Sequence, residues 1–289
     1  GLSLALQEGR IDAAWRTIPD PEIPSYQSNP NFEVIGEPPM RTISLGLNQH
    51  EGNPFADLNV RKAVAYALNA DEIISEAYQG TFAHKVLSFM PDSLAGYTPA
   101  MEEYDGEQLA KAQAALAASD YPTGFDTELY FTSVHWGQSE EDMAVIIQEQ
   151  LAKIGINVEL KIVEYSYILT ETKEGRLPMY FLHWVFDYAD GFQYLNNWLY
   201  GGPNPFWAGR YGYNNTEVNA LLKQATETID TPDRLALYGD IQEIGAETIP
   251  CIPIGLHYQY AVLDSSKVSG FAIPSPFWST PFTDVTIAD

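Results

Sequence analysis

The chain has 289 residues, of which 45% are hydrophobic and 13% aromatic, so it can bury a large core as one domain or as one domain with part of another. Acidic residues outnumber basic ones by 39 to 15, which gives a formal net charge of −24 and a surface that repels anionic lipid and excludes nucleic acid as a partner. No stretch approaches the ~20 consecutive apolar residues that a membrane-spanning helix needs.

The N-terminal part of the chain changes character at Thr42. Residues 1–41 carry repeated prolines after a possible short helix at 2–9, and we expect them to be mostly irregular. From Thr42, apolar residues alternate with polar or small ones, which predicts a strand. Asp57 then caps a helix whose apolar face includes Val60 and Val64.

Two capping boxes predict the starts of further helices. Asn69 is followed three residues later by Glu72, and Asp105 by Gln108, the second pair opening an alanine-rich helix. The clearest helical periodicity begins at Ser139 and ends before a glycine. Strands are predicted at residues 129–134, 156–162, 179–184, 252–256 and 260–263, and helices at 139–154, 167–175, 218–229 and, capped by Thr231, at 231–247. This alternation predicts a mixed α/β or α+β layer structure.

Sequence motifs of common enzyme families are absent. The chain has no phosphate-binding loop, nucleophile elbow, His-Glu-x-x-His zinc motif or dinucleotide fingerprint. Its five histidines are isolated from one another, which favours ordinary core or surface roles over metal ligation. Asp187 and Asp190 could suggest acid/base chemistry, but no nucleophile motif accompanies them. The single cysteine, Cys251, lies in an apolar run and is predicted to be a buried thiol.

Aromatic residues outside the regular core stripes, several of them on loops at predicted strand ends, are the strongest sign of a binding surface. Such residues commonly line ligand clefts, although each could also fill the core at the base of a loop. These residues are Trp136, Trp184, Phe186, Tyr188, Trp207 and Trp278.

The segment from Ser44 to Asn69 carries a family resemblance. Its residues from Asn53 read NPFADLNVRKAVAYALN, which closely resembles the pattern N…PF-x-D-x-x-VR-x-A-x-x-x-A-I of family 5 extracellular solute-binding proteins. That family serves ABC importers of oligopeptides, dipeptides, nickel and some oligosaccharides. Further segments resemble the family in the same order: Gly9–Ala14, Leu151–Val158, Trp184–Asp190, Tyr213–Leu222 and Pro250–Ile254. Most of these residues cap, end or pack helices, so they indicate the family better than the ligand.

The resemblance implies a fold and a domain organisation. Family members are longer and have two lobes that close on ligand, a type II periplasmic-binding-protein-like clamshell. We expect residues 42–258 to form the C-terminal ligand-binding lobe, residues 1–41 to be a hinge and remnant of the N-terminal lobe, and residues 259–289 to return to that lobe. The chain is thus expected to be the C-terminal portion of a longer protein and to hold half of a binding site.

The resemblance also implies a ligand anchor. In peptide-binding relatives an aspartate of the Asp-Tyr stretch binds the ligand's α-ammonium, and the matching residue here is Asp187; a carboxylate in a drying cleft binds an ammonium strongly. Asp187 could instead cap a helix or orient a loop. Relatives usually have proline where this chain has Gly191, which weakens the peptide assignment. The predicted ligand-binding residues are Asp187, Trp184, Tyr188, Trp136, Asn48 and Trp207.

We therefore expect an extracytoplasmic substrate-binding component of an ABC importer, which binds oligopeptides or dipeptides and delivers them to the permease's transmembrane subunits. Ligand would shift an open–closed equilibrium of the lobes. We expect a monomer without catalytic activity, cofactor or metal, in the periplasm or at the cell surface, held by a lipid on a preceding N-terminal segment. Gly1 to Leu4 do not form a signal peptide, as in a mature or truncated product. The alternatives are an oligosaccharide-binding member of the family, a hydrolase or metal-binding protein, and a signalling receptor ectodomain.

Overall fold

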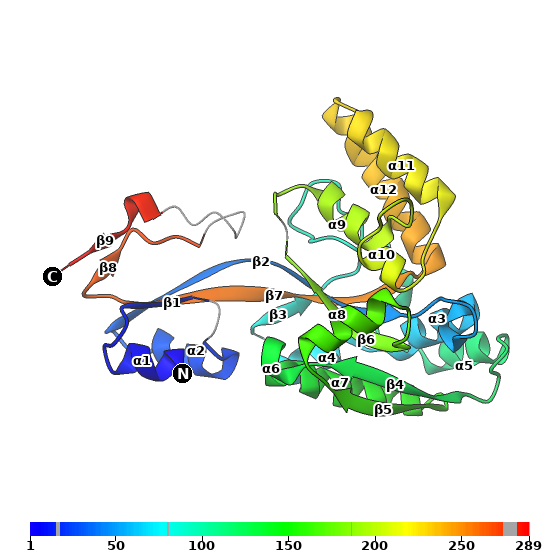
Figure 1. Cartoon of the computed structure of the whole chain (residues 1–289), viewed down its shortest axis with the longest axis horizontal. Helices are drawn as coiled ribbons and strands as arrows, with labels where there is room; N and C mark the ends of the chain where they lie inside the picture. Colours follow the sequence, from blue (N-terminus) through cyan, green and yellow to red (C-terminus); the bar gives the residue numbers. More distant parts are fainter. Residues whose placement is uncertain (16–17, 80, 186, 274–281, 289) are drawn as a thin grey trace. The chain divides into compact units, whose positions relative to one another are not determined.

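The computed structural model describes residues 1–15, 18–79, 81–185, 187–273 and 282–288, with the backbone alone at 37–40 (Figure 1). Its internal contacts divide the chain into two compact units. Unit 1 comprises Gly1–Arg41, Val185–Ala189 and His257–Asp289, and unit 2 comprises Thr42–Trp184 and Asp190–Leu256. Phe186 and Trp278, two of the aromatic residues singled out in the sequence, lie outside the described residues.

The described chain alternates strands and helices. The strands are β1 (Ala13–Trp15), β2 (Phe32–Leu47), β3 (Ala83–Lys85), β4 (Phe125–Phe131), β5 (Ile156–Ile162), β6 (Met179–Trp184), β7 (Cys251–Asp264), β8 (Val268–Ser269) and β9 (Thr286–Ile287). The α-helices are α1 (Leu2–Gln7), α2 (Ile23–Gln27), α3 (Leu58–Ala67), α4 (Ala70–Ala77), α5 (Leu109–Ala117), α6 (Ser133–Trp136), α7 (Gln138–Ala152), α8 (Tyr165–Lys173), α9 (Gly191–Leu199), α10 (Trp207–Arg210), α11 (Thr216–Glu227) and α12 (Thr231–Thr248). Short 3₁₀ turns lie at Asp20–Glu22, Pro54–Ala56, Glu102–Tyr104 and Phe282–Asp284.

A mixed sheet forms the centre of unit 2. The C-terminal part of β2 pairs with β6 in antiparallel fashion, and β6 and β5 flank β4 as parallel neighbours. Helix α7 packs against β4 and β5, and α8 packs against β4. Helices α11 and α12 lie side by side and both contact α9 (Figure 1). The parallel strands β4 and β6 therefore end at the same edge of the sheet.

Unit 1 is smaller and contains strand β1, which pairs with the C-terminal part of β7. Its apolar cluster is formed by Ala261, Leu263, Val268 and Ile273, against which Trp15 and Phe271 pack. Near this pairing, His257 Nε2 lies 2.7 Å from the Asp20 carboxylate. Burial, with a smaller contribution from the charge of Arg41, lowers the pKa of His257 to about 4.

The segment that resembles the family signature is committed to folding contacts. Asn53 accepts a hydrogen bond from the Phe55 amide, and Asp57 caps α3 through the Asn59 amide at 2.7 Å. Arg61, only 6% exposed, donates to four main-chain carbonyls: Phe55 and Ala56 before α3, and Thr248 and Ile249 at the end of α12. Burial lowers the pKa of Arg61 to about 10. The signature arginine thus ties the start of one helix to the end of another.

Most strongly periodic elements match their predictions. The predicted strands at residues 156–162 and 179–184 are β5 and β6, and the helices predicted from Ser139 and around residues 218–229 are α7 and α11. Asp57 and Asn69 cap α3 and α4 as expected. The return bond expected from Glu72 to the Asn69 amide is made instead by Gln150, which in turn donates to Glu72.

Several local predictions were wrong. Residues 1–41 are more regular than expected, because α2 and the first ten residues of β2 lie there; proline suits a strand wherever its missing N–H is not needed. Asp105 does not cap α5, since its carboxylate binds Lys85 at 2.8 and 2.9 Å. Helix α12 is capped by the side chain of Asp230 rather than of Thr231. Strand β4 ends at Phe131 and β7 is one continuous strand, while α9 and α10 were not predicted at all.

Candidate functional site

The candidate site lies in unit 2, where β4 and β6 end. Strand β4 leads through Thr132 into the short helix α6, and β6 ends at Trp184. In open α/β sheets, ligands bind beyond the carboxyl ends of parallel strands, where side chains from several loops meet. Two groups of aromatic side chains occupy this edge, one on each face of β6, because successive residues of a strand point to opposite faces.

The first group centres on Trp136. Its ring stacks on that of His183 at a centroid distance of 4.4 Å. The neighbouring His135 ring stacks on Tyr165 at 4.2 Å, and Trp136 meets Tyr165 edge to face at 5.9 Å. Trp136 is partly exposed and His135 is exposed. These rings form a partly exposed aromatic surface of the kind that binds apolar or ring-shaped groups.

A buried carboxylate holds the first group in place. Glu140 on α7 and His183 on β6 have side chains that are 2% and 1% exposed, and His183 Nε2 lies 2.9 Å from a Glu140 oxygen. The other Glu140 oxygen accepts a hydrogen bond from the Thr132 amide at 2.7 Å. The carboxylate therefore fixes both the His183 ring, on which Trp136 rests, and the backbone that begins α6. The sequence analysis missed this pair.

The second group lies on the opposite face of β6. The Trp184 ring lies 5.1 Å from that of Phe206, which is 42% exposed. The Arg210 guanidinium lies over the rings of Phe206 and Trp207, at 5.3 and 4.6 Å from their centroids. Trp207 is 2% exposed and also stacks on Trp198. A cation thus lies among aromatic rings close to the predicted residue Trp184.

Two of the predicted ligand residues have inward-facing contacts. Asn48 is 2% exposed; its amide donates to the carbonyls of Gly175 and Leu177 at 2.7 and 2.9 Å, and its carbonyl accepts from the His50 amide. Trp207 is enclosed by Trp198 and its neighbours. These contacts organise the loops around the strand ends, and a ligand role for either residue stays a prediction.

The remaining predicted residues fall in both units. Trp136 and Trp184 lie in unit 2, whereas Asp187 and Tyr188 lie in the short segment that belongs to unit 1. The side chains of Asp187 and Tyr188 are exposed, Tyr188 to 48%. Within unit 2, the structure brings Trp136 against His183, the residue next to Trp184. The roles of all four in ligand binding stay predictions.

Asp190 has a structural role that weakens the idea of an acid/base pair with Asp187. Its carboxylate caps α9 through the Phe192 amide at 2.8 Å, forms an ion pair with Arg234 at 2.6 Å and accepts from the Tyr238 hydroxyl at 2.6 Å. The following residue, Gly191, packs closely: a side-chain carbon there would lie 2.6 Å from the end of the Met90 side chain. A glycine at this position therefore suits this packing.

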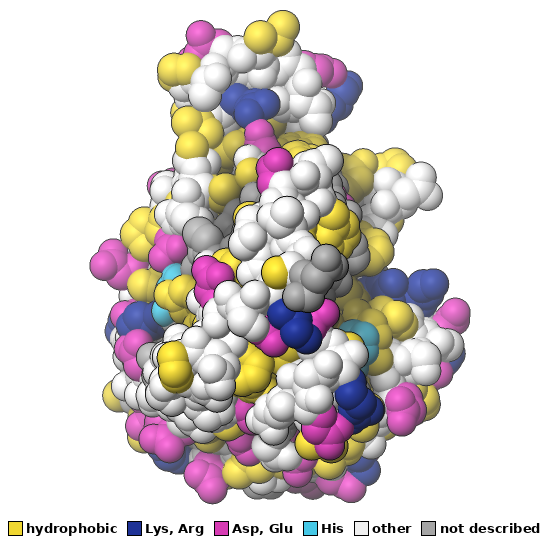
Figure 2. Space-filling view, turned by 90° about the vertical axis from the view of Figure 1, so that its left-hand side faces the viewer, with side chains coloured by type: hydrophobic (Ala, Val, Ile, Leu, Met, Phe, Trp, Pro, Cys, Tyr) yellow, Lys and Arg dark blue, Asp and Glu magenta, His cyan; other side chains and the backbone are white. Residues whose placement is uncertain are grey.

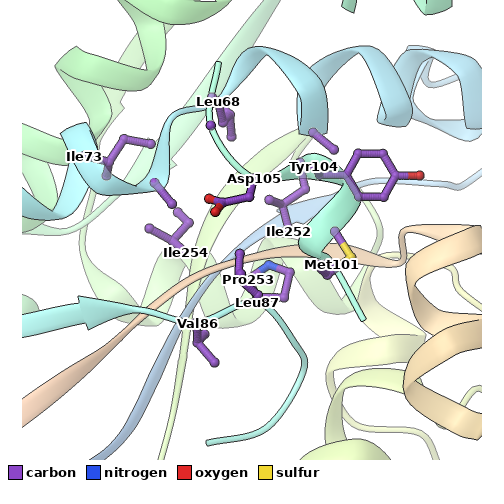
Figure 3. A pocket seen from close by; sticks show the side chains of 13 residues that line it. Leu68, Ile73, Val86, Leu87, Met101, Tyr104, Asp105, Ile252, Pro253 and Ile254 are labelled. Atoms are coloured by element: carbon purple, nitrogen blue, oxygen red, sulfur yellow. The ribbon is translucent and has the colours of Figure 1, made fainter. Parts of the chain in front are cut away.

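A small cavity elsewhere in unit 2 does not qualify as a ligand site. It has a volume of about 30 Å³ and lies among mostly apolar side chains, including Leu68, Ile73 and Ile254 (Figure 3). This is room for about one water molecule. The carboxylate of Asp105, which also lines the cavity, is already bound to Lys85. None of the predicted ligand residues lines it.

Acidic side chains are scattered over the face that Figure 2 shows, without gathering into one patch. Among the described residues, no three His, Cys, Asp or Glu side chains are grouped as the ligands of a metal ion would be. No helix in the described part of the chain has the length and apolar character needed to cross a membrane. The thiol of Cys251 is buried, as predicted.

Comparison with protein families gives one match. The family model described as "Bacterial extracellular solute-binding proteins, family 5 Middle" matches residues 2–206. Among curated relatives, heme-binding protein A of Haemophilus influenzae is 26% identical over 268 residues, which are 92% of this chain and 48% of that protein. The glutathione-binding protein GsiB of Escherichia coli K12 is 26% identical over 293 residues, covering 98% and 54% of the two chains. The chain thus spans about half the length of these relatives.

Solved structures of other proteins also resemble this chain over nearly its whole length. The periplasmic binding protein DppA from Helicobacter pylori, in complex with peptide STSA, is 29% identical with a TM-score of 0.86, over 100% of this chain and 55% of that one. HbpA2 from Haemophilus parasuis is 26% identical with a TM-score of 0.81, over 99% and 56% of the two chains. The predicted mixed α/β fold of the type II periplasmic binding proteins is confirmed.

Proposed function

Because the chain belongs to family 5 of the bacterial extracellular solute-binding proteins, we propose that it binds short peptides as the extracytoplasmic substrate-binding component of an ABC importer. The observation that carries this proposal is the likeness, over the whole described fold, to a binding protein that holds the peptide STSA. The relatives are substrate-binding proteins, and we propose that this chain likewise binds its ligand without catalysis.

In this proposal Asp187 binds the peptide's α-ammonium. Of the two acids in its stretch, Asp190 is committed to α9 and Arg234, whereas the Asp187 side chain is exposed. A carboxylate and an ammonium that leave water together form a strong charge-assisted bond. Tyr188, Trp184 and Trp136 supply apolar faces for the peptide's side chains, while Asn48 and Trp207 support the site from behind the surface.

Transport would require a change of conformation. We propose that residues 42–258 act as one lobe and that residues 1–41 and 259–289 belong with a second. Ligand would favour the closed form, which the importer's transmembrane subunits would meet in the periplasm or at the cell surface. A lipid on a preceding segment would hold the protein there.

Tryptophan fluorescence of the chain tests the ligand class. The protein is titrated with peptide STSA and with Met-Leu, each with a free and an acetylated N-terminus, and separately with oligosaccharides, because the aromatic surface also suits sugar rings. Wild type is compared with Asp187→Asn and with Asp240→Asn, which removes the same charge from an exposed site on α12.

We expect saturable peptide binding that acetylation or Asp187→Asn weakens by roughly 10-fold or more, the loss of one charge-assisted hydrogen bond. Asp240→Asn should bind as wild type does. Response to oligosaccharides alone would refute peptide binding and leave the aromatic residues as the recognition surface. Peptide binding that is indifferent to both acetylation and Asp187→Asn would keep the ligand class but remove Asp187 as its anchor.

A further inference from the structure

Among the described residues, Arg210 has no carboxylate partner, although the chain is strongly acidic. One of its nitrogens, Nη1, donates to the Leu169 carbonyl at 2.8 Å and to the Thr172 hydroxyl at 3.0 Å. Within the described part of the chain its Nε and Nη2 make no hydrogen bond. These two donors are the parallel pair on one edge of the guanidinium that binds carboxylates in bidentate fashion.

Several other basic residues of the described chain do pair with carboxylates. Lys85 lies between Asp71 and Asp105, Arg234 pairs with Asp190, and Arg176 pairs with Glu171. Arg61 also lacks an acidic partner, but it is buried and its nitrogens donate to carbonyls. Arg210 thus combines partial burial with donors that remain available.

The surroundings of Arg210 strengthen its attraction for an anion. Two rings, Phe206 and Trp207, cover its guanidinium and exclude water from that side. Electrostatic attraction grows as the local dielectric falls, so a partly desolvated arginine binds a carboxylate more tightly than one in open water. A single local cation also offsets the repulsion that a net charge of −24 exerts on an anionic ligand.

A second observation concerns a buried hydroxyl on β6 that is under the electrostatic influence of Arg210. Tyr180 on β6 is 0% exposed, and its hydroxyl has no hydrogen-bond partner among the described residues. Buried polar groups without partners are rare and costly in native proteins. Burial raises the pKa of both Tyr180 and Tyr165, and the positive charge of Arg210 opposes both shifts.

We propose that Arg210 recognises a carboxylate of the ligand through Nε and Nη2, with the Tyr180 hydroxyl as a supporting donor. The inference rests on the proposed function and narrows its substrate class to ligands that carry a carboxylate for Arg210 to bind. The carboxylate can be the peptide's C-terminus or an acidic side chain, and the chemistry at Arg210 is the same for both.

The competing explanation is purely structural. Leu169 and Thr172 lie in the last turns of α8, so Nη1 also satisfies groups near the C-terminus of that helix. This role would make Arg210 matter for stability but not for the difference between a carboxylate and its amide. The test must therefore measure that difference.

Isothermal titration of the chain with three matched ligand pairs measures it. The first pair is peptide STSA as free acid and as C-terminal amide. The second is amidated Ser-Glu-Ser-Ala and amidated Ser-Gln-Ser-Ala, which moves the carboxylate to a side chain. The third is N-acetylphenylalanine and its amide, which carry no ammonium and so do not depend on Asp187.

In wild type we expect the carboxylate member of at least one pair to bind roughly 10- to 100-fold more tightly than its amide, as one charge-assisted bidentate contact provides. Arg210→Gln should bring that ratio to about 1. Tyr180→Phe, which removes a hydroxyl that no described residue bonds, should lower the ratio while leaving thermal stability unchanged. Arg176→Gln, with the same change in charge at a surface ion pair, should keep the wild-type ratio. If Arg210→Gln does not fold, Arg210→Lys and Tyr180→Phe supply the same comparison.

The outcomes separate this inference from the proposed function. Equal binding of acids and amides by wild type, or an undiminished ratio in Arg210→Gln, overturns the role of Arg210 while peptide binding stands. Arg210-dependent binding of N-acetylphenylalanine without any peptide binding supports the role of Arg210 and overturns the peptide proposal. Binding of none of the six ligands overturns both.

Discussion

Replacement of Arg61 by methionine is expected to destabilise the fold through main-chain carbonyls rather than through a lost ion pair. The arginine lies between α3 and α12 and bonds four carbonyls at 2.8 to 3.0 Å. Two of them, those of Thr248 and Ile249, lie at the end of α12, where Ile249 has a left-handed backbone with φ of 45°. Methionine keeps an unbranched apolar side chain in place of the arginine stem and leaves all four carbonyls without their donor.

The magnitude follows from two opposing contributions. A buried carbonyl that loses its donor costs about 1–3 kcal/mol, so four carbonyls cost roughly 4–12 kcal/mol. Burial of the charge lowers the pKa of Arg61 from 12.5 to about 10, which means that removing the charge returns about 3 kcal/mol at ~1.4 kcal/mol for each pKa unit. Since the carbonyls at the rim can take up water, we expect the low end, a net loss of about 2–4 kcal/mol.

Urea denaturation followed by circular dichroism measures this loss as a lower midpoint at constant slope. The control is Arg176→Met, which removes an arginine that is 53% exposed from its ion pair with Glu171 and should cost less than about 1 kcal/mol. If Arg61→Met falls within about 0.5 kcal/mol of wild type, the four hydrogen bonds do not hold α3 to α12.

Two further predictions concern titrating groups. Because the pKa of His257 is lowered to about 4, the unfolded chain binds a proton near pH 6.5 that the folded chain refuses. The contribution of neutral His257 to the free energy of unfolding is thus intact above pH 6.5. It is lost as the pH falls toward 4, by up to about 3 kcal/mol. The difference between the urea midpoints at pH 7 and pH 5 should therefore be smaller in His257→Gln than in wild type. An equal difference in the two proteins would contradict this reasoning. Burial raises the pKa of Cys251 to about 12, so Ellman's reagent at pH 8 should react with it only in urea; rapid reaction of the native chain would contradict its burial.

Local patterns predicted those elements whose signals are local. Strand β5 and helix α7 each follow a regular periodicity, and β6 is a short apolar run. Asp57 and Asn69 bond amides two and three residues ahead of them. Helix α9 carries a short helical pattern, since its polar residues Gln193, Asn196 and Asn197 share one face, but this pattern was not recognised in the sequence. Asp105 failed as a cap because its partner, Lys85, lies 20 residues away in the chain.

The candidate site was predictable only where one residue carries the signal. Trp136 and Trp184 could be placed at strand ends from sequence, but the pairing of Glu140 with His183 joins residues 43 positions apart. A signal existed, since Glu140 lies in the same buried stripe of α7 as Met143 and Ile147. A charged residue in an apolar stripe indicates a buried partner. Arg210 lies in a helix that was itself not predicted, so its position among aromatic rings could not be predicted from the sequence.

The residues that carry the family resemblance differ from the candidate ligand-binding residues, which explains why a family is easier to infer than a ligand. The family resemblance is carried by Asn53, Asp57 and Arg61. Their polar side-chain atoms form hydrogen bonds with main-chain amides and carbonyls. They would make the same contacts whatever the ligand, which fits relatives at 26% identity that bind heme and glutathione. Under the proposed function, ligand choice lies with groups at the strand ends that retain donors or exposed faces. Arg210 retains both, so its substitution should change which ligands bind, whereas that of Arg61 should change only whether the chain folds.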